Sequence, residues 1–111
     1  MEFSDGMGRL NGIANSDDLN KHTIATPTTA ATYVYEVDTV NLVLGDLLEL
    51  RVYDKVDGTN YRQVWKACYQ HPQINNSKVS PPLALAGAGA KFTLKQVAGT
   101  GRAFPWSVRS I

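Results

Sequence analysis

Hydrophobic and polar residues alternate along several short stretches of the chain, which is the pattern of half-buried β-strands. The clearest stretch is residues 48–53, whose sequence LELRVY places three aliphatic side chains on one side of the chain. The same period of two recurs in residues 32–37, 91–97 and 102–111, which are also rich in β-branched and aromatic residues. We therefore expect strands in all four stretches.

Glycine, proline and asparagine separate these stretches at short intervals, as is typical of all-β proteins. Asp57-Gly58 supplies a hairpin turn into a further strand at residues 61–70. Pro81-Pro82 interrupts residues 78–85, so any strand there is broken or lies at an edge. No stretch has a convincing helical period. The pattern predicts six strands in an all-β fold, either an antiparallel β-sandwich or a small β-barrel.

The first 31 residues follow neither period. Isolated apolar residues at Phe3, Leu10 and Ile13 lie among Gly, Asn, Asp and Ser. A segment of this kind buries too little apolar surface by itself to offset the entropy of ordering it. We therefore predict an extended N-terminal arm at residues 1–31 and a β-sandwich domain at residues 32–111. The arm is either a floppy terminus or a segment that orders against a neighbouring subunit through these apolar residues.

Length and charge narrow the class of protein. The chain has 111 residues, which suits one domain, and its 11 Lys and Arg against 10 Asp and Glu give a net charge of +1. This balance disfavours a protein that binds nucleic acid mainly through phosphates, although a local basic patch can persist within a neutral total. The acidic start is no secretory signal, and no apolar stretch is long enough to span a bilayer. We expect folding in a cytoplasm, no nucleic-acid partner and no membrane partner.

Residues with reactive side chains are few and scattered. Cys68 is the single cysteine, and its apolar neighbours favour a buried, inert thiol. Together with His22 and His71 it provides too few ligands for a structural zinc site. Lys91 follows a Gly-Ala-Gly-Ala sequence but enters a strand, whereas a phosphate-binding loop opens a helix. The sequence predicts no catalytic residues, no cofactor, no metal site and no enzymatic activity.

Residues 99–106, Gly-Thr-Gly-Arg-Ala-Phe-Pro-Trp, are the most distinctive stretch. One interpretation is a tight turn with positive φ feeding a last strand, with Phe104 and Trp106 in the core. The other makes Arg102 and these two aromatic side chains an interface anchor, because Arg and Trp are frequent hot-spot residues. Pro105 indicates that this strand is at an edge or carries a bulge.

Two pieces of the chain resemble a family of phage proteins. Residues 92–96 (FTLKQ), followed by Gly-Thr-Gly-Arg at 99–102 and Phe-Pro-Trp-Ser at 104–107, look like the C-terminal signature of small proteins from tailed-phage structural gene clusters. Residues 45–52 (GDLLELRV) are similar to the other recurring piece of that family, a G-D-x-x-E-x-R strand. The resemblance covers roughly residues 32–111, and residues 1–31 contribute nothing to it.

The resemblance implies a virion structural protein, made in the cytoplasm of a host bacterium. The role that it favours is a capsid decoration, or cement, protein that bridges and stabilises major capsid subunits as a dimer or trimer. In this hypothesis the arm orders against the shell. Two alternatives stay open: a tail or head–tail connector subunit, or a carbohydrate-binding module for host attachment that stacks sugars on exposed tyrosine and tryptophan rings.

Overall fold

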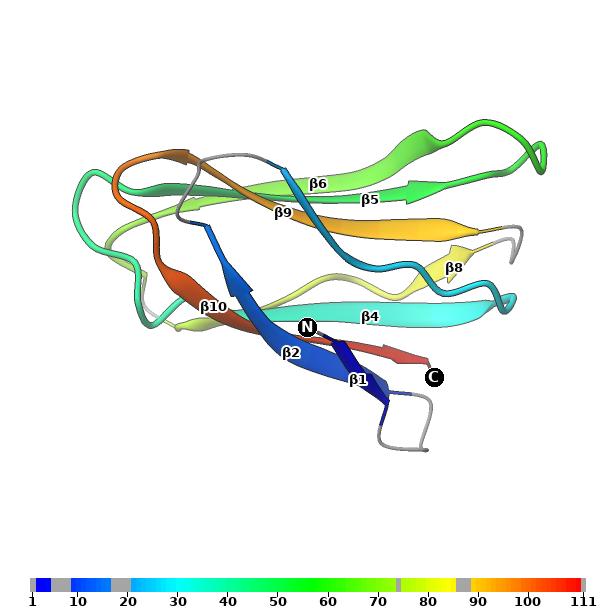
Figure 1. Cartoon of the computed structure of the whole chain (residues 1–111), viewed down its shortest axis with the longest axis horizontal. Coiled ribbons are helices and arrows are strands. Elements are labelled where there is room, and N and C mark those ends of the chain that lie inside the picture. Colours follow the sequence, from blue (N-terminus) through cyan, green and yellow to red (C-terminus); the bar gives the residue numbers. More distant parts are fainter. Residues whose placement is uncertain (1, 5–8, 17–20, 74, 86–88, 111) are drawn as a thin grey trace.

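The computed structural model has two antiparallel β-sheets packed face to face (Figure 1). It describes residues 2–4, 9–16, 21–73, 75–85 and 89–110. One sheet has the strand order β1-β2-β10-β4-β7, with β8 also paired to β4, and the other has the order β3-β9-β5-β6. The predicted antiparallel β-sandwich is confirmed. The strands are β1 (Glu2–Ser4), β2 (Arg9–Asn15), β3 (His22–Ala25), β4 (Ala31–Asp38), β5 (Leu47–Asp54), β6 (Arg62–Gln70), β7 (Ser77–Val79), β8 (Leu83–Leu85), β9 (Ala90–Ala98) and β10 (Ala103–Ser110).

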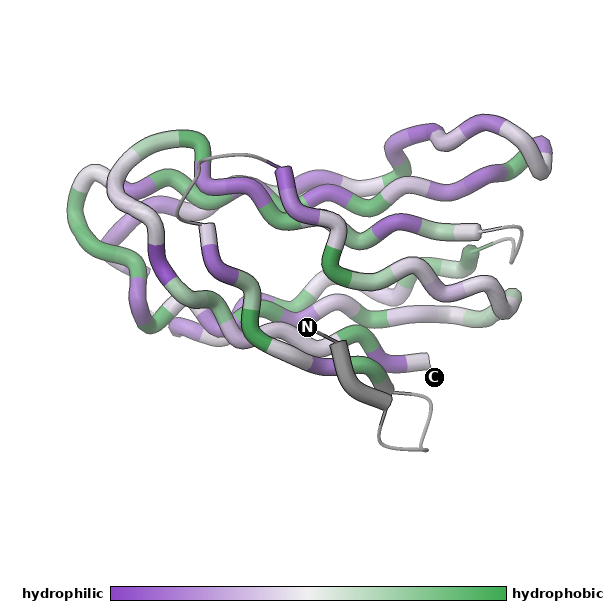
Figure 2. The backbone as a smooth tube through the Cα atoms, viewed as in Figure 1, coloured by the Kyte–Doolittle hydropathy of each residue, from purple (hydrophilic) through white to green (hydrophobic). Residues whose placement is uncertain are grey.

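The core lies between the sheets and follows from the alternation in the sequence. Every second residue of β5 is buried, and hydrophobic and hydrophilic segments alternate along the chain in Figure 2. Tyr35 on β4 joins the two layers. Its ring packs edge-on against the Phe92 ring of β9, with 5.5 Å between the ring centroids, and its hydroxyl donates to the Thr93 carbonyl at 3.1 Å. Burial raises the pKa of Tyr35 well above its ordinary value, so the hydroxyl stays protonated and remains a donor.

The N-terminal segment contributes strands to both layers, which differs from the predicted arm. β2 pairs with β10 over seven residue pairs, and β3 pairs with β9. Ala14, Ile24 and Ala25 lie in the core. The sandwich therefore does not begin at residue 32. The sequence did not reveal this pairing because β2 contains Gly and Asn, which are poor strand formers, and because its partner is far away along the chain.

β6 is an edge strand of the second sheet, although its sequence also allowed a central position. Its inward residues, Trp65, Ala67 and Tyr69, are half-buried, whereas Val64 is exposed. Cys68 is exposed as well, so the expectation of a buried thiol is wrong. The reason is the period of two: Cys68 falls on the outer face, opposite Glu49 of β5.

β7 and β8 are the two halves of a broken edge strand along β4, as the double proline predicts. Ser80 lies between the halves and replaces the missing ladder. Its backbone N–H donates to the Tyr35 carbonyl at 2.7 Å, and its hydroxyl accepts the Tyr35 N–H at 2.9 Å. Pro81 and Pro82 can therefore follow without leaving buried backbone groups unpaired.

Candidate interaction surfaces

Asp46 organises one end of the sandwich, where the β4–β5 loop meets the β9–β10 turn. Its carboxylate accepts the Val43 N–H at 3.0 Å, the Thr100 N–H at 3.3 Å and the Arg102 Nε–H at 3.0 Å. The side chain is almost fully buried, while Arg102 is partly exposed. We call these four residues the Asp46 clasp. It fixes the two loops relative to each other.

The ionisation of Asp46 depends on these partners. Burial alone would raise the pKa of its carboxyl group. The hydrogen bonds from Val43, Arg102 and Thr100 and the positive charge of Arg102 outweigh that effect, and the pKa lies below its ordinary value of 3.8. Asp46 is therefore a carboxylate at neutral pH, and the clasp is fully formed there.

A second buried polar pair lies beside the clasp. Ser16 and Gln96 are both fully buried, and the Ser16 hydroxyl is hydrogen-bonded to the Gln96 side chain. Ser16 also closes a backbone loop: its N–H donates to the Arg102 carbonyl at 2.9 Å, and the Arg102 N–H donates back to its hydroxyl at 3.0 Å. The Gln96 amide donates to the carbonyls of Ala98 and Thr100. The β9–β10 turn is thus held from inside by side chains of β9 and of the segment after β2.

Two distinctive stretches of the sequence, residues 45–52 and 92–107, therefore meet in space. Asp46, immediately before β5, is bonded to Thr100 and Arg102 of the Gly-Thr-Gly-Arg stretch, and Gln96 of the preceding FTLKQ stretch donates to the Thr100 carbonyl. Gly99 has a φ of +94°, as the turn interpretation predicts, and a Cβ atom there would lie 2.0 Å from Asp46 Oδ1. Asp46, Gln96 and Gly99 therefore have a structural role in the fold.

The C-terminal interface candidates are used internally. Phe104 is fully buried and Trp106 is 4% exposed, and both belong to the core between the sheets. The core interpretation accounts for them, and their side chains are not presented to a partner. Arg102 is 29% exposed and bound to Asp46, so only part of its guanidinium faces solvent.

The N-terminal candidates have three different outcomes. Leu10 on β2 is half-buried and packs against the core. Ile13, three residues further along the same strand, is 55% exposed. Phe3 lies on β1, which pairs with β2, but its side chain is outside the described part of the structure. Of the three, Ile13 has the exposed apolar side chain that a surface contact requires.

An apolar loop projects at the clasp end of the sandwich. Val40, Val43 and Leu44 are 55%, 42% and 83% exposed, whereas Leu42 between them is buried and anchors the loop to the core. The Asp38 carboxylate accepts the Val40 N–H at 3.0 Å, and Asp46 accepts that of Val43. We call residues 40–44 the apolar tip. Its signal in the sequence is the run Val-Asn-Leu-Val-Leu at residues 40–44.

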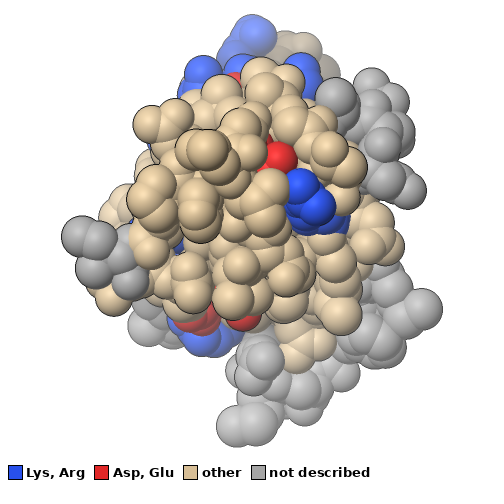
Figure 3. All heavy atoms as spheres, turned by 90° about the vertical axis from the view of Figure 1, so that its left-hand side faces the viewer, with Lys and Arg blue, Asp and Glu red and all other residues tan. Residues whose placement is uncertain are grey.

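The tip lies within a surface of low charge. Figure 3 views this end directly: uncharged residues cover most of it, and charged atoms lie mainly at the margins apart from one adjacent acid and base. The same loop is coloured hydrophobic at the left of Figure 2. With Val40, Val43 and Leu44 exposed on it and charged residues mainly at its margins, this end has the general arrangement of a protein–protein contact.

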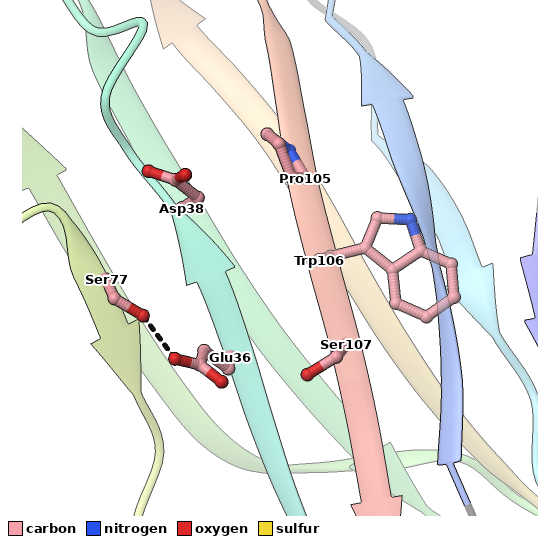
Figure 4. A pocket seen from close by; sticks show the side chains of 6 residues that line it. All are labelled: Glu36, Asp38, Ser77, Pro105, Trp106 and Ser107. Atoms are coloured by element: carbon pink, nitrogen blue, oxygen red, sulfur yellow. Dashed lines mark hydrogen bonds between the residues drawn. The ribbon is translucent and has the colours of Figure 1, made fainter. Parts of the chain in front are cut away.

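A shallow hollow of about 250 Å³ lies on the outer face of the first sheet (Figure 4). It forms where the pairing of β10 with β4 begins, at Trp106. The preceding residue, Pro105, is paired only with β2, and as a proline it has no N–H to donate toward β4. The Glu36 carboxylate accepts from Ser77 and is paired with Arg109 at 3.0 Å. Glu36 and Ser77 are therefore engaged with each other and with Arg109. The remaining lining residues are Asp38 and Ser107.

The tyrosines divide between core and surface. Tyr33 and Tyr35 are buried, as sheet packing predicts. The rings of Tyr53, Tyr61 and Tyr69 are half-buried, and lysine ammonium groups lie over each of them at 4.1–5.5 Å from the ring centroid. A sugar that stacks on these rings would have to compete with the lysine side chains.

The described residues include neither a cluster of metal ligands nor a membrane-spanning helix. They contain no group of three or more His, Cys, Asp and Glu side chains that would hold a metal ion. None of the described segments is a long apolar helix of the kind that crosses a bilayer. Comparison with models of known protein families finds no match, and comparison with curated proteins finds none either.

Proposed function

We propose that this protein is a non-enzymatic structural subunit of a tailed-phage virion, and that it acts as a capsid decoration protein bound to the major capsid protein. The proposal rests on the sequence resemblance together with one structural observation: an exposed apolar tip on a rigidly held loop. A decoration protein needs a stable body and a preformed contact surface, and needs no reactive groups.

The tip supports this role because its shape is set before any partner binds. Leu44 is 83% exposed, while hydrogen bonds to Asp38 and Asp46 and the buried side chain of Leu42 hold the loop on either side. A preorganised apolar group loses little conformational entropy on binding, so most of its burial energy contributes to affinity. Repeated over several copies on a shell, even a modest contact gives strong attachment.

A tail or head–tail connector subunit would use the same tip against a ring neighbour, so copy number separates the two roles. The first experiment is to quantify the protein in purified particles by mass spectrometry against the major capsid protein. A ratio near unity is expected for decoration of the whole shell. A handful of copies per particle would move the protein to the connector or tail, and absence from particles would overturn the virion proposal.

The tip itself is tested by Leu44→Ser. Losing a central apolar contact should weaken attachment to particles that lack the protein by about 2 kcal/mol, or roughly 30-fold, measured by co-sedimentation. Val56→Ser is the matched control, because Val56 is equally exposed at 80% but lies in the β5–β6 turn at the opposite end of the sandwich. If both variants weaken attachment to the particles equally, or if neither weakens it, attachment through the tip is contradicted.

A further inference from the structure

Charge is distributed unevenly between the two layers, although the whole chain has a net charge of only +1. The three longest strands of the second sheet, β5, β6 and β9, have two acidic residues, Glu49 and Asp54, and Asp54 is buried. Their basic residues are Arg51, Arg62, Lys66, Lys91 and Lys95. The outer face of this sheet therefore has a clear excess of positive charge.

The strand register brings these charges together. Arg51 of β5 lies opposite Lys66 of β6. On the other side of β5, Lys95 of β9 lies opposite Glu49, and Lys91 of β9 lies opposite Tyr53. Neighbouring strands are about 4.8 Å apart and alternate residues about 6.8 Å apart, so the group spans three strands as one patch. We call Arg51, Lys66, Lys91 and Lys95 the basic face.

Glu49 reduces this charge without cancelling it. Its carboxylate lies 2.6 Å from Arg51 Nε and 3.6 Å from Lys66 Nζ. Burial alone would raise the pKa of Glu49, but these two cations outweigh it and hold the pKa below its ordinary value, so Glu49 is ionised. One carboxylate thus faces four cations, and the basic face keeps a net positive charge at neutral pH.

Tyrosine rings position further ammonium groups at the borders of this face. Lys21 Nζ lies 5.0 Å from the centre of the Tyr53 ring, and Lys91 and Lys55 lie 4.1 and 4.5 Å from that of Tyr61. Cation–π contacts of this kind are worth about 0.5–1 kcal/mol at exposed sites. They keep these ammonium groups beside tyrosines of β5 and of the β5–β6 connection, where they add to the positive charge near the basic face.

We propose that the basic face binds the phosphate backbone of a nucleic acid, without sequence preference. Lysine dominates the face, and lysine is depleted in the cores of protein–protein interfaces but suits phosphate as a compact point charge. On β5, Leu48, Leu50 and Val52 point inward, and the two outward positions in the middle of the strand are Glu49 and Arg51, so charged side chains and not apolar ones occupy the centre of the face. A polyanion is the partner whose charge complements it. This inference is independent of the proposed attachment through the tip.

The test uses the intact chain and a fluorescent single-stranded oligonucleotide of about 20 nucleotides, which exceeds the usual site size of one small β domain. Fluorescence anisotropy should detect binding at about 50 mM salt that weakens steeply toward about 200 mM. The double variant Lys66→Gln/Lys95→Gln should bind at least tenfold more weakly. Its plot of log affinity against log salt should be shallower by about 1.4, the value for two lost phosphate contacts on a single strand.

The control is Lys78→Gln/Arg109→Gln, which removes the same charge from strands β7 and β10 of the other sheet. It should bind almost as the unaltered chain does, and thermal unfolding verifies that both variants are folded. Absence of binding at low salt, or an equal loss in both variants, overturns the proposal. A competition experiment compares poly-glutamate with unlabelled oligonucleotide at equal total charge. If poly-glutamate displaces the labelled oligonucleotide equally well, the proposal is overturned, because the face would then bind acidic polypeptides.

Discussion

Asp46 shows how much of this fold depends on single polar residues in close-packed places. Its carboxylate joins a loop at the start of β5 to a turn more than fifty positions later in the chain. Gly99 lets the turn approach it, because any side chain there would overlap both the carboxylate and the Asp46 backbone. The clasp therefore requires two residue types at once, an acid at 46 and a glycine at 99.

Gly99→Ala should destabilise the protein strongly. A φ of +94° costs an L-residue roughly 1–2 kcal/mol, and the contact with Asp46 adds to this, so we expect a loss of about 3 kcal/mol in the free energy of unfolding. Gly45→Ala is the control, because Gly45 has nearly the same φ, +95°, with no atom within 4 Å of a built Cβ. Urea unfolding of both variants measures the difference. Equal losses would show that the approach to Asp46 is not tight.

Asp46→Asn tests the charge of the clasp through its pH dependence. At pH 7 the variant should be less stable by about 2 kcal/mol, because hydrogen bonds to an ionised group are lost. The folded-state pKa of Asp46 is lowered, so its stabilisation is complete above the ordinary value of 3.8 and disappears as the pH falls through the folded-state value. The difference in melting temperature between the two proteins should therefore narrow below about pH 3.8. A gap that stays constant down to pH 2 would contradict an ionised clasp.

Residue-scale prediction from the sequence succeeded where the local backbone decides. Positive φ at Gly99 and the Asp57-Gly58 turn follow from residue type alone, and Asp57 accepts the N–H groups of Thr59 and Asn60. The partners of Asp46 could not be predicted, since Arg102 is one of many basic residues and only the fold brings it near. Cys68 was placed wrongly because apolar neighbours say nothing about which face of a strand is covered.

At the scale of elements, the N-terminal strands are the clearest difference between expectation and structure. β2 covers one side of β10 along seven residue pairs, and Ser16 at its end is fully buried. Without β2, β10 would become an edge strand with unpaired backbone groups. The segment therefore contributes to the stability of the fold, in addition to any contact that exposed Ile13 makes with a partner.

Deletion of residues 1–16 should consequently lower the melting temperature markedly or abolish cooperative unfolding. Deletion of residues 1–8 is the comparison: it removes β1, which pairs only with β2 among the described strands, and should cost much less. Circular dichroism melts of the two truncations measure the difference. If both kept the stability of the whole chain, the N-terminal segment would be an arm after all, as its composition suggested.

The strands that the alternation predicts were located well. Residues 48–53 fall within β5, 91–97 within β9, and 32–37 within β4. The double proline gave two short edge strands, with Ser80 replacing the interrupted ladder. Periodicity works here because one face of each strand is buried and the other is not. It fails for β2, where small and polar residues blur the contrast.

At the scale of the whole molecule, the two layers give the chain two unlike surfaces. The basic face covers the outside of one sheet, and the apolar tip projects at one end of the sandwich, beside the Asp46 clasp. A net charge of +1 gave no sign of the first, because charges that cancel in the total are separated in space. In the sequence, the tip is visible only as a short, mostly apolar run at residues 40–44.

The sequence by itself determined the fold class, most strand positions, the turns and the inward faces of β4, β5 and β9, because these depend on residue type and a period of two. The tertiary structure alone decided what pairs across long separations. It placed β2 beside β10, joined Asp46 to Arg102, put Phe104 and Trp106 inside, and gathered Lys66, Arg51 and Lys95 on one face. Such contacts depend on strand order and register, which local composition does not encode.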